Sequence, residues 1–177
     1  MKTKLIISSL FVTSVFISAA HAADGQIKFT GNITATACKI DSSSANQTVN
    51  MGTISSSSFT GPNSTSAPTR FSIRLTDCPP EYQYAQVKFD GQTDRANSNY
   101  LALTANKGGM SPAQGVAIAL YEDDSNTSID LARNSRSQTL ENGKSNELKF
   151  VAKYIATAKA VTPGAGDSVA NFTVTYN

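Results

Sequence analysis

Histidine and tryptophan are the scarcest side chains of this sequence. It contains no tryptophan and one histidine, His21. That histidine lies in an N-terminal export signal described below, so we expect the mature chain to have no imidazole. Imidazole is the usual base of Ser–His and Cys–His nucleophile pairs and a common metal ligand. The sequence therefore predicts neither an enzyme of those classes nor a His-ligated metal, and we expect no cofactor.

Charge is also scarce, at 16% of residues. The full chain has 15 Lys and Arg against 13 Asp and Glu, and removal of Lys2 and Lys4 with the export signal leaves thirteen of each sign. No basic run remains in the mature chain. Nucleic acid and anionic membrane surfaces are therefore not expected as partners.

Long apolar runs are absent beyond the first 22 residues. Lys2 and Lys4 precede an apolar run, Leu5 to Ser18, that only Ser and Thr interrupt, and Ala20-His21-Ala22 offers small residues for a peptidase. We predict that residues 1–22 are a secretory signal peptide. The run is short and serine-rich for a membrane span, although a retained anchor is the alternative. The exported product is expected to have no stable membrane insertion.

Cysteine is limited to Cys38 and Cys78. In an exported protein an even count indicates a disulfide, and two cysteines allow one connectivity. Closing a loop of about forty residues stabilises a fold by about 4 kcal/mol in the chain-entropy account. The alternative, a pair of free or redox-active thiols, lacks the C-x-x-C spacing of an oxidoreductase.

Short alternating apolar stretches make up most of the remaining chain, which has the length of one domain. Turn residues separate them, including Asp90-Gly91 and the acidic run Glu122–Asp124, and no long amphipathic helix is evident. Ser55–Ser58 and Gly61–Pro68 are expected to be surface loops. The pattern predicts an all-β sandwich. The expected strands lie at Ile27–Ile33, Val49–Met51, Phe71–Leu75, Val87–Phe89, Leu101–Leu103, Val116–Leu120, Leu148–Tyr154 and Phe172–Tyr176.

The C-terminal segment keeps strand alternation almost to its last residue. After Gly164, apolar side chains alternate at Phe172, Val174 and Tyr176, and Tyr176 is next to last. These three side chains share one face of a strand, because its side-chain period is two. Chain ends are usually frayed and polar. We therefore expect this end to pair in a sheet and its exposed edge to meet another chain.

Four fragments in order carry a resemblance to a known family. They are the stretch ADGQIKFTGNITATAC ending at Cys38, with Gly31 seven residues before that cysteine; FSIRLTDC ending at Cys78; Gly164, fourteenth from the end; and the penultimate Tyr176. Behind a signal peptide, this arrangement resembles the type 1 fimbrial protein family, the pilus subunits of the chaperone–usher pathway.

The resemblance implies an incomplete immunoglobulin-like β-sandwich, the pilin fold, which lacks its last strand. A groove over the core would be bordered by the chaperone-binding residues Gly164, Phe172, Val174 and Tyr176. Residues 37–177 would form the pilin domain. Residues 23–36 would be a donor-strand extension that inserts Gly25, Ile27, Phe29, Gly31 and Ile33 into the next subunit, by strand addition.

The resemblance also implies partners and a location. A periplasmic chaperone would lend the missing strand first, and an outer-membrane usher would export the subunit into a head-to-tail polymer with other pilus subunits. The product would be a structural, non-enzymatic subunit of an extracellular fimbrium that supports cell adhesion. The compact extension favours a minor or adaptor subunit over a major rod subunit, and a terminator is a further alternative.

Three other interpretations stay open at the level of sequence. Residues 23–36 could be an ordinary first strand of their own domain. The chain could be a secreted, monomeric carbohydrate-binding β-sandwich with a platform of Tyr82, Tyr84 and Tyr100. An enzyme or calcium site would need carboxylates from a set that resembles turn residues and lacks the D-x-D-x-D-G calcium pattern. That set is Asp90, Asp94, Glu122, Asp123 and Asp124.

Overall fold

The computed structural model describes residues 25–31, 33 and 37–177, in two units divided after Ile33. In the first unit the described residues form neither helix nor strand. The side chains of Ile27, Phe29 and Ile33 are 82%, 88% and 106% exposed. The strand expected at Ile27–Ile33 is therefore not formed by these residues within their own chain.

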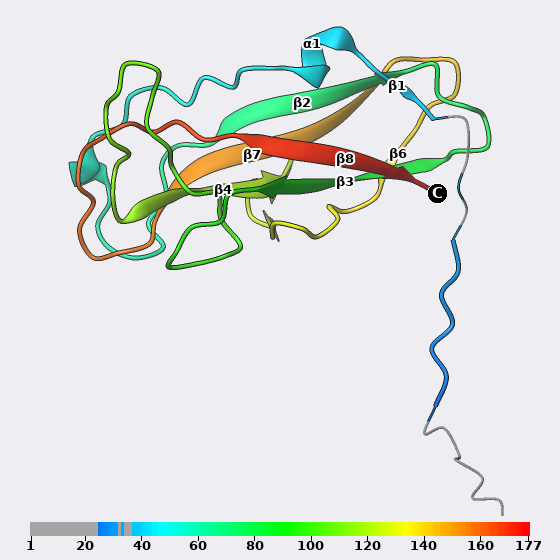
Figure 1. Ribbon diagram of the computed structural model, residues 1–177. Helices are drawn as coiled ribbons and strands as arrows, with labels where there is room; N and C mark the ends of the chain where they lie inside the picture. The colour runs from blue at the N-terminus through cyan, green and yellow to red at the C-terminus, as the bar shows by residue number, and fades with distance from the viewer. Residues whose placement is uncertain (1–24, 32, 34–36) are drawn as a thin grey trace, which may run out of the picture. The chain divides into compact units, whose positions relative to one another are not determined.

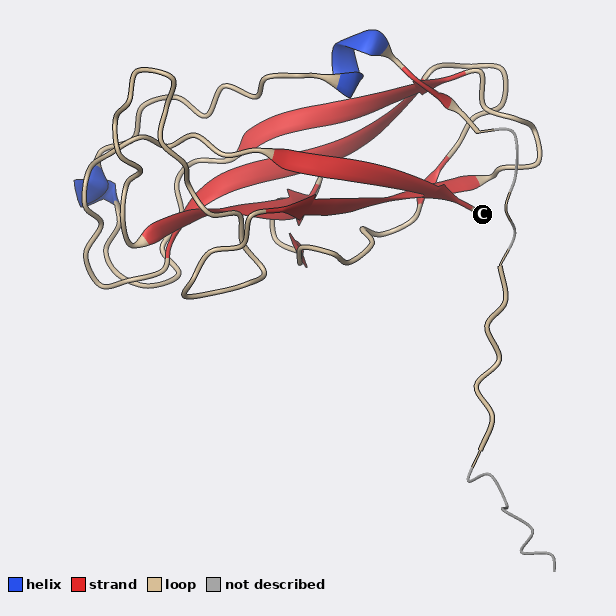
Figure 2. Ribbon diagram, in the orientation of Figure 1, coloured by secondary structure: helices blue, strands red, loops and turns tan. Residues whose placement is uncertain are grey.

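The second unit is a sandwich of two antiparallel sheets (Figure 1, Figure 2). One sheet has the order β1-β2-β7-β4-β5 and the other has the order β6-β3-β8. The all-β class expected from the alternation is confirmed. The elements are β1 (Lys39–Ile40), α1 (Ser42–Ala45), the 3-10 turn η1 (Ser56–Ser58), β2 (Thr69–Thr76), β3 (Tyr84–Gly91), β4 (Val116–Glu122), β5 (Ser128–Ile129), β6 (Gln138–Thr139), β7 (Asn146–Ala156) and β8 (Ala170–Tyr176).

The core lies between the two sheets and is centred on three phenylalanines. Phe71 of β2 pairs with Phe150 of β7, and their ring centroids lie 5.7 Å apart. Phe89 of β3 meets Phe150 edge-on at 5.1 Å. Aromatic pairs in this arrangement add to the stabilisation that burial of their area provides. Alternate residues of β2 and β3 point into this layer, as the period of a strand requires.

Strand β4 is buried on both faces, which its alternation did not predict. Val116, Ile118 and Leu120 face the main core, as expected. The residues between them form a second cluster with Val151 and Ile155 of β7 (Ala117, Ala119 and Tyr121). Alanine is compatible with either environment, so the sequence pattern could not distinguish them.

Some local expectations were wrong. Asp90-Gly91, read as a turn, ends β3 because the pairing with β8 continues to Gly91 and Ala170. A Cβ on Gly91 would lie 2.5 Å from Leu101 Cδ2, so close approach explains this glycine. Glu122, read as a turn residue, is the buried last residue of β4.

Other expected strands are absent from the described chain. Val49–Met51 is a loop, although Met51 packs on the core. Leu101 makes only isolated bridges, to Thr93 and Ile118. Ser56–Ser58, expected in a loop, forms the short turn η1 because the side chain of Ser55 accepts a hydrogen bond from the Ser57 amide.

The disulfide between Cys38 and Cys78 is present, which confirms the pairing expected from the cysteine count. Strand β1 begins directly after Cys38, and Lys39 pairs with Thr76 two residues before Cys78. The bond therefore fastens a strand of only two residues to the end of β2.

Ser125, in the turn after β4, carries two unfavourable features. Its φ is 59°, in the left-handed region, and its buried hydroxyl lacks a hydrogen-bond partner among the described residues. We expect Ser125→Gly to raise the free energy of unfolding by about 0.5–1 kcal/mol, because glycine removes both costs but adds chain entropy. Equilibrium unfolding in denaturant measures the change. Ala132→Gly, at a φ of 62° with no hydroxyl, should gain less. A loss of stability in Ser125→Gly would contradict the account.

Candidate assembly site at the β8 edge

Strand β8 has a sheet partner on one side. Tyr84 and Asn177 exchange both backbone hydrogen bonds, at 3.1 and 3.0 Å. In an antiparallel ladder such pairs recur at every second residue. With the observed register, Thr175 and Thr173 therefore bond to β3. The backbone N–H and C=O groups of the alternate residues, Phe172, Val174 and Tyr176, therefore point away from β3.

The same three residues direct their side chains to the core. Phe172, Val174 and Tyr176 are half-buried and pack against the main cluster, whereas Thr173 and Thr175 are exposed. Within residues 37–177, no strand pairs with β8 on the side opposite β3. The edge therefore combines free backbone groups with incompletely covered apolar side chains, the combination that strand addition requires.

The far side of β3 is closed, in contrast to β8. The amides of Ala132 and Ser135 each donate to a β3 carbonyl at 2.8 Å, those of Phe89 and Val87 respectively. The Ser135 hydroxyl also accepts from the Val87 amide at 2.9 Å. The loop before β6 thus occupies this side of β3, so an added strand would pair in this sheet with β8.

Phe71, which is linked to β8 through Phe89, is also incompletely covered. Phe89 lies opposite Phe172 in the ladder and contacts Phe71 at a centroid distance of 6.0 Å. Phe71 is half-buried although it belongs to the central phenylalanine group. Further half-buried side chains pack on the same core from the first part of the unit (Ile40, Met51, Ile54 and Phe59).

The end of β8 is held in place by two contacts. The main-chain oxygen of Asn177 accepts hydrogen bonds from the amides of Gln83 and Tyr84, at 2.9 and 3.1 Å. The ring of Tyr176 stacks on Tyr82 at 5.0 Å with an interplanar angle of 20°. Burial, with Tyr82 nearby, raises the pKa of Tyr176. The edge is therefore presented by an ordered strand.

Comparison with known proteins decides the family. A family model described as fimbrial protein matches residues 27–177. The chain belongs to the fimbrial protein family. It is 37% identical to the type 1 fimbrial subunit of Salmonella typhimurium, over 99% of this chain and 100% of that one. It is 35% identical to the type-1 fimbrial protein A chain of Escherichia coli K12, over 95% of this chain and 92% of that one.

Solved structures agree with this assignment. The type I fimbria protein of Burkholderia pseudomallei is 36% identical, with a TM-score of 0.58 over 81% of this chain and 91% of that one. The P pilus rod subunit PapA is 25% identical, with a TM-score of 0.65 over 80% of this chain and 100% of that one. The fimbrial subunit therefore has the immunoglobulin-like pilin fold and is a structural component of a chaperone–usher pilus, assembled outside the cell after passage through the periplasm. The predicted fold class, function and location are confirmed.

Gly164 of the fimbrial subunit lies before β8 rather than in it. A Cβ at this position would lie 2.4 Å from the Ala113 nitrogen and 2.7 Å from the Ser111 oxygen. The neighbouring Ala165 amide donates to Ser111 at 2.8 Å. Close backbone approach thus accounts for Gly164, and its contact with a chaperone stays a prediction.

The two glycines of the extension differ from Gly164. Around Gly25 and Gly31, no atom comes within 4 Å of a Cβ built at either position. The described chain therefore gives no steric reason for these glycines. The expectation that they are needed where the segment meets another molecule stays a prediction.

The tyrosines proposed as a sugar platform are not brought together. Tyr82 packs against the main core and stacks on Tyr176, whereas Tyr100 packs against the second cluster with Tyr121. Tyr84 is exposed at the start of β3. The fimbrial subunit therefore lacks the shared aromatic face that the carbohydrate-binding alternative required of these three residues.

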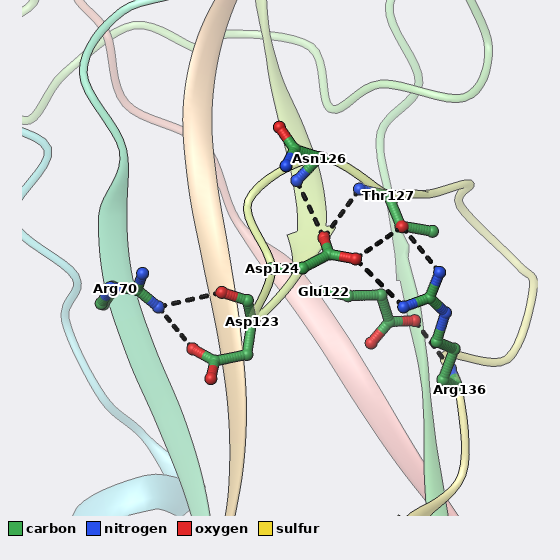
Figure 3. Close-up of polar contacts among 7 residues, drawn as sticks. All are labelled: Arg70, Glu122, Asp123, Asp124, Asn126, Thr127 and Arg136. Carbon is green, nitrogen blue, oxygen red and sulfur yellow. Dashed lines mark hydrogen bonds and ion pairs between the residues drawn. The ribbon is translucent and has the colours of Figure 1, made fainter.

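Asp124 belongs to a hydrogen-bonded turn (Figure 3). It accepts from the backbone amides of Thr127 and Asn126, both at 2.8 Å, and from the Thr127 hydroxyl at 2.7 Å. Arg136 adds an ion pair at 3.0 Å. These bonds, chiefly those of Thr127, hold the pKa of Asp124 well below its usual range. Asp124 thus secures the β4–β5 turn.

Glu122 and Asp123, the acidic neighbours of Asp124, have separate partners (Figure 3). Glu122 accepts from the Arg136 amide at 2.7 Å, and burial raises the pKa of this carboxyl. Asp123 pairs with Arg70 across the outer face of the five-stranded sheet. The three carboxylates do not converge on a common point, as an acid–base pair would.

The remaining candidate carboxylates and metal ligands are equally separate. Asp90 forms an ion pair with Lys88 at 3.6 Å, and Asp94 caps the turn at Ala96 and Asn97. In the part of the chain that the structure describes, no three His, Cys, Asp or Glu residues form a group suited to a metal ion. No helix among the described residues has the length and apolar character needed to cross a membrane.

Proposed function

We propose that the fimbrial subunit polymerises by donor-strand exchange. The extension at residues 23–36 of one molecule adds to the β8 edge of the next. One observation carries the proposal: the backbone groups of Phe172, Val174 and Tyr176 point away from β3, while their side chains lie on the core. An incoming strand would complete both the ladder and the apolar layer.

The chemistry of the extension supports its role as donor. Residues 25, 27, 29, 31 and 33 share one strand face, since the period is two. Ile27, Phe29 and Ile33 are large, apolar and exposed in the chain itself. Full burial of each is worth about 1.5–3 kcal/mol. Together with backbone bonds, burial of three such residues offsets the ordering cost of the segment.

The β8 edge would also be the binding site for a chaperone before assembly. We infer that a periplasmic chaperone covers β8 before assembly and that an outer-membrane usher exchanges it for the donor segment. The signal peptide proposed at residues 1–22 would direct the chain to that compartment. No bond-making step is involved, so the subunit acts without catalysis and contributes to adhesion as part of a filament.

The names of the relatives bear on the position in the pilus. One solved relative is a rod subunit, and a relative 33% identical in Escherichia coli O157:H7 is named a probable major fimbrial subunit. These favour a major rod subunit over the minor subunit that the compact extension favoured. A rod subunit would meet a second copy of itself at β8.

A double substitution tests the donor role. We expect Ile27→Ser with Phe29→Ser to abolish filament growth, because two large side chains would no longer be buried at the joint. Lys28→Ser with Thr30→Ser is the matched control, since these residues lie on the opposite strand face. Filament length in electron micrographs and multimers that survive SDS without boiling are the measurements.

Deletion of residues 23–36 should leave a subunit that a chaperone still binds but that cannot join the preceding molecule. Normal filaments from this deletion or from the Ile27/Phe29 variant would refute the donor role. Wild-type protein that runs as a lone monomer without boiling would favour the monomeric alternative.

A further inference from the structure

The turn that leads into β7 contains the chain's Asn-Gly dipeptide, Asn142-Gly143. Both residues are exposed, and Gly143 has a φ of 73° at the third position of the turn. The Lys144 amide reaches the Glu141 carbonyl at 3.4 Å, and the Asn142 side chain reaches the Pro80 carbonyl at 3.4 Å. Both contacts are long for hydrogen bonds. The side-chain amide of Asn142 is therefore loosely held.

The base of this turn, by contrast, is tightly held by one buried side chain. Asn146 accepts from the Glu141 amide at 2.7 Å. It donates to the carbonyls of Glu141 and Lys144, at 3.1 and 3.2 Å. Its nitrogen also lies 3.9 Å from Cys78 Sγ. Asn146 thus fixes the separation of the turn's two ends, directly beside the disulfide.

We propose that Asn142 is a site of spontaneous deamidation and that its isoaspartyl product opens this turn. The Gly143 amide loses its proton to hydroxide, and its nitrogen attacks Cγ of Asn142. The bond from Cγ to the side-chain nitrogen breaks, ammonia leaves, and a five-membered succinimide remains. Water then opens the ring to aspartate or to isoaspartate. The net change is water consumed and ammonia released, with no oxidation or reduction.

The local structure favours this reaction at Asn142 over other asparagines. Gly143 has no side chain to obstruct approach of its nitrogen, and its backbone is permissive. Asn63 and Asn134 are also exposed, but each precedes a serine. The Asn142 side chain is restrained by the long contact to the Pro80 carbonyl, which breaks at little cost.

The isoaspartyl product would not fit the turn. Its main chain passes through the former side-chain carbon, which adds one carbon between Glu141 and Lys144. Asn146 cannot then keep its bonds to both carbonyls, and a buried amide that loses a partner is costly. We therefore expect the turn to open at the end of the domain that carries Cys78.

To test the site, purified wild-type filaments are kept at mildly alkaline pH, and peptide mapping by mass spectrometry measures the conversion of each asparagine. Enzymatic methylation of isoaspartate gives a second measurement. We expect Asn142 to convert several-fold faster than Asn63 and Asn134, and more slowly at mildly acidic pH, where hydroxide is scarcer. Conversion of Asn142 no faster than those two residues would overturn the site assignment.

Limited proteolysis of the same samples tests the structural consequence. Aged wild-type protein should gain cleavage within residues 141–145. Asn142→Gln, which forms a cyclic imide far less readily, should not gain it after the same treatment. Asn142→Asp, examined fresh, adds the charge without lengthening the main chain and should remain uncut. Conversion of Asn142 to isoaspartate without new cleavage, or equal cleavage of fresh Asn142→Asp, would overturn turn opening.

Discussion

Val174→Pro is expected to leave the subunit folded and to block strand addition at β8. The Val174 amide points away from β3, so proline removes a hydrogen-bond donor without breaking the existing ladder. Proline is tolerated on edge strands in this orientation. An incoming strand would lose its partner at the centre of the edge. SDS-resistant multimers and filament length measure the effect, which should be near-complete loss of assembly.

Two controls separate the backbone from the side chain. Val174→Ala loses similar packing but keeps the amide, and should assemble more extensively than Val174→Pro. Thr173→Pro removes an amide that bonds to β3, and should lower the free energy of unfolding by about 1–3 kcal/mol. If Val174→Pro were folded and assembled to the wild-type extent, β8 would not be the acceptor edge.

Replacing both cysteines, Cys38→Ser with Cys78→Ser, should lower the free energy of unfolding by about 2–5 kcal/mol. The bond joins residues 40 apart in sequence and fastens β1, whose pairing consists of two residues. Loss of the bond frees the unfolded chain and leaves β1 weakly attached. Denaturant unfolding of the purified subunit and its yield from the periplasm are the measurements.

Reduction of the wild-type protein should reproduce much of this loss, although the double variant also places two serine hydroxyls at buried positions. Arg74→Gln offers a surface control: its ion pair with Glu147 at 2.6 Å is partly exposed, and screening by solvent leaves such pairs with little effect on stability. A double cysteine variant as stable as the Arg74→Gln control would show that β1 is held by other contacts.

Apolar alternation predicted the long strands correctly. Phe71–Leu75, Leu148–Tyr154 and Phe172–Tyr176 all lie in observed strands, β2, β7 and β8. It was misleading at Val49–Met51, where apolar residues reach the core from a loop. It also missed β5 and β6, since strands of two residues carry too little pattern to be recognised.

The periodicity of side chains in the sequence was enough to determine which residues of the C-terminal strand share a face. The predicted signal peptide and the count of two cysteines were enough to indicate the disulfide. Periodicity could not determine where backbone hydrogen bonds go, because their partners are distant in sequence. Only the tertiary structure decided that β3 takes one side of β8 and leaves Phe172, Val174 and Tyr176 facing an open edge. The burial of Glu122 was likewise decided by the loop that carries Arg136, which local sequence does not specify.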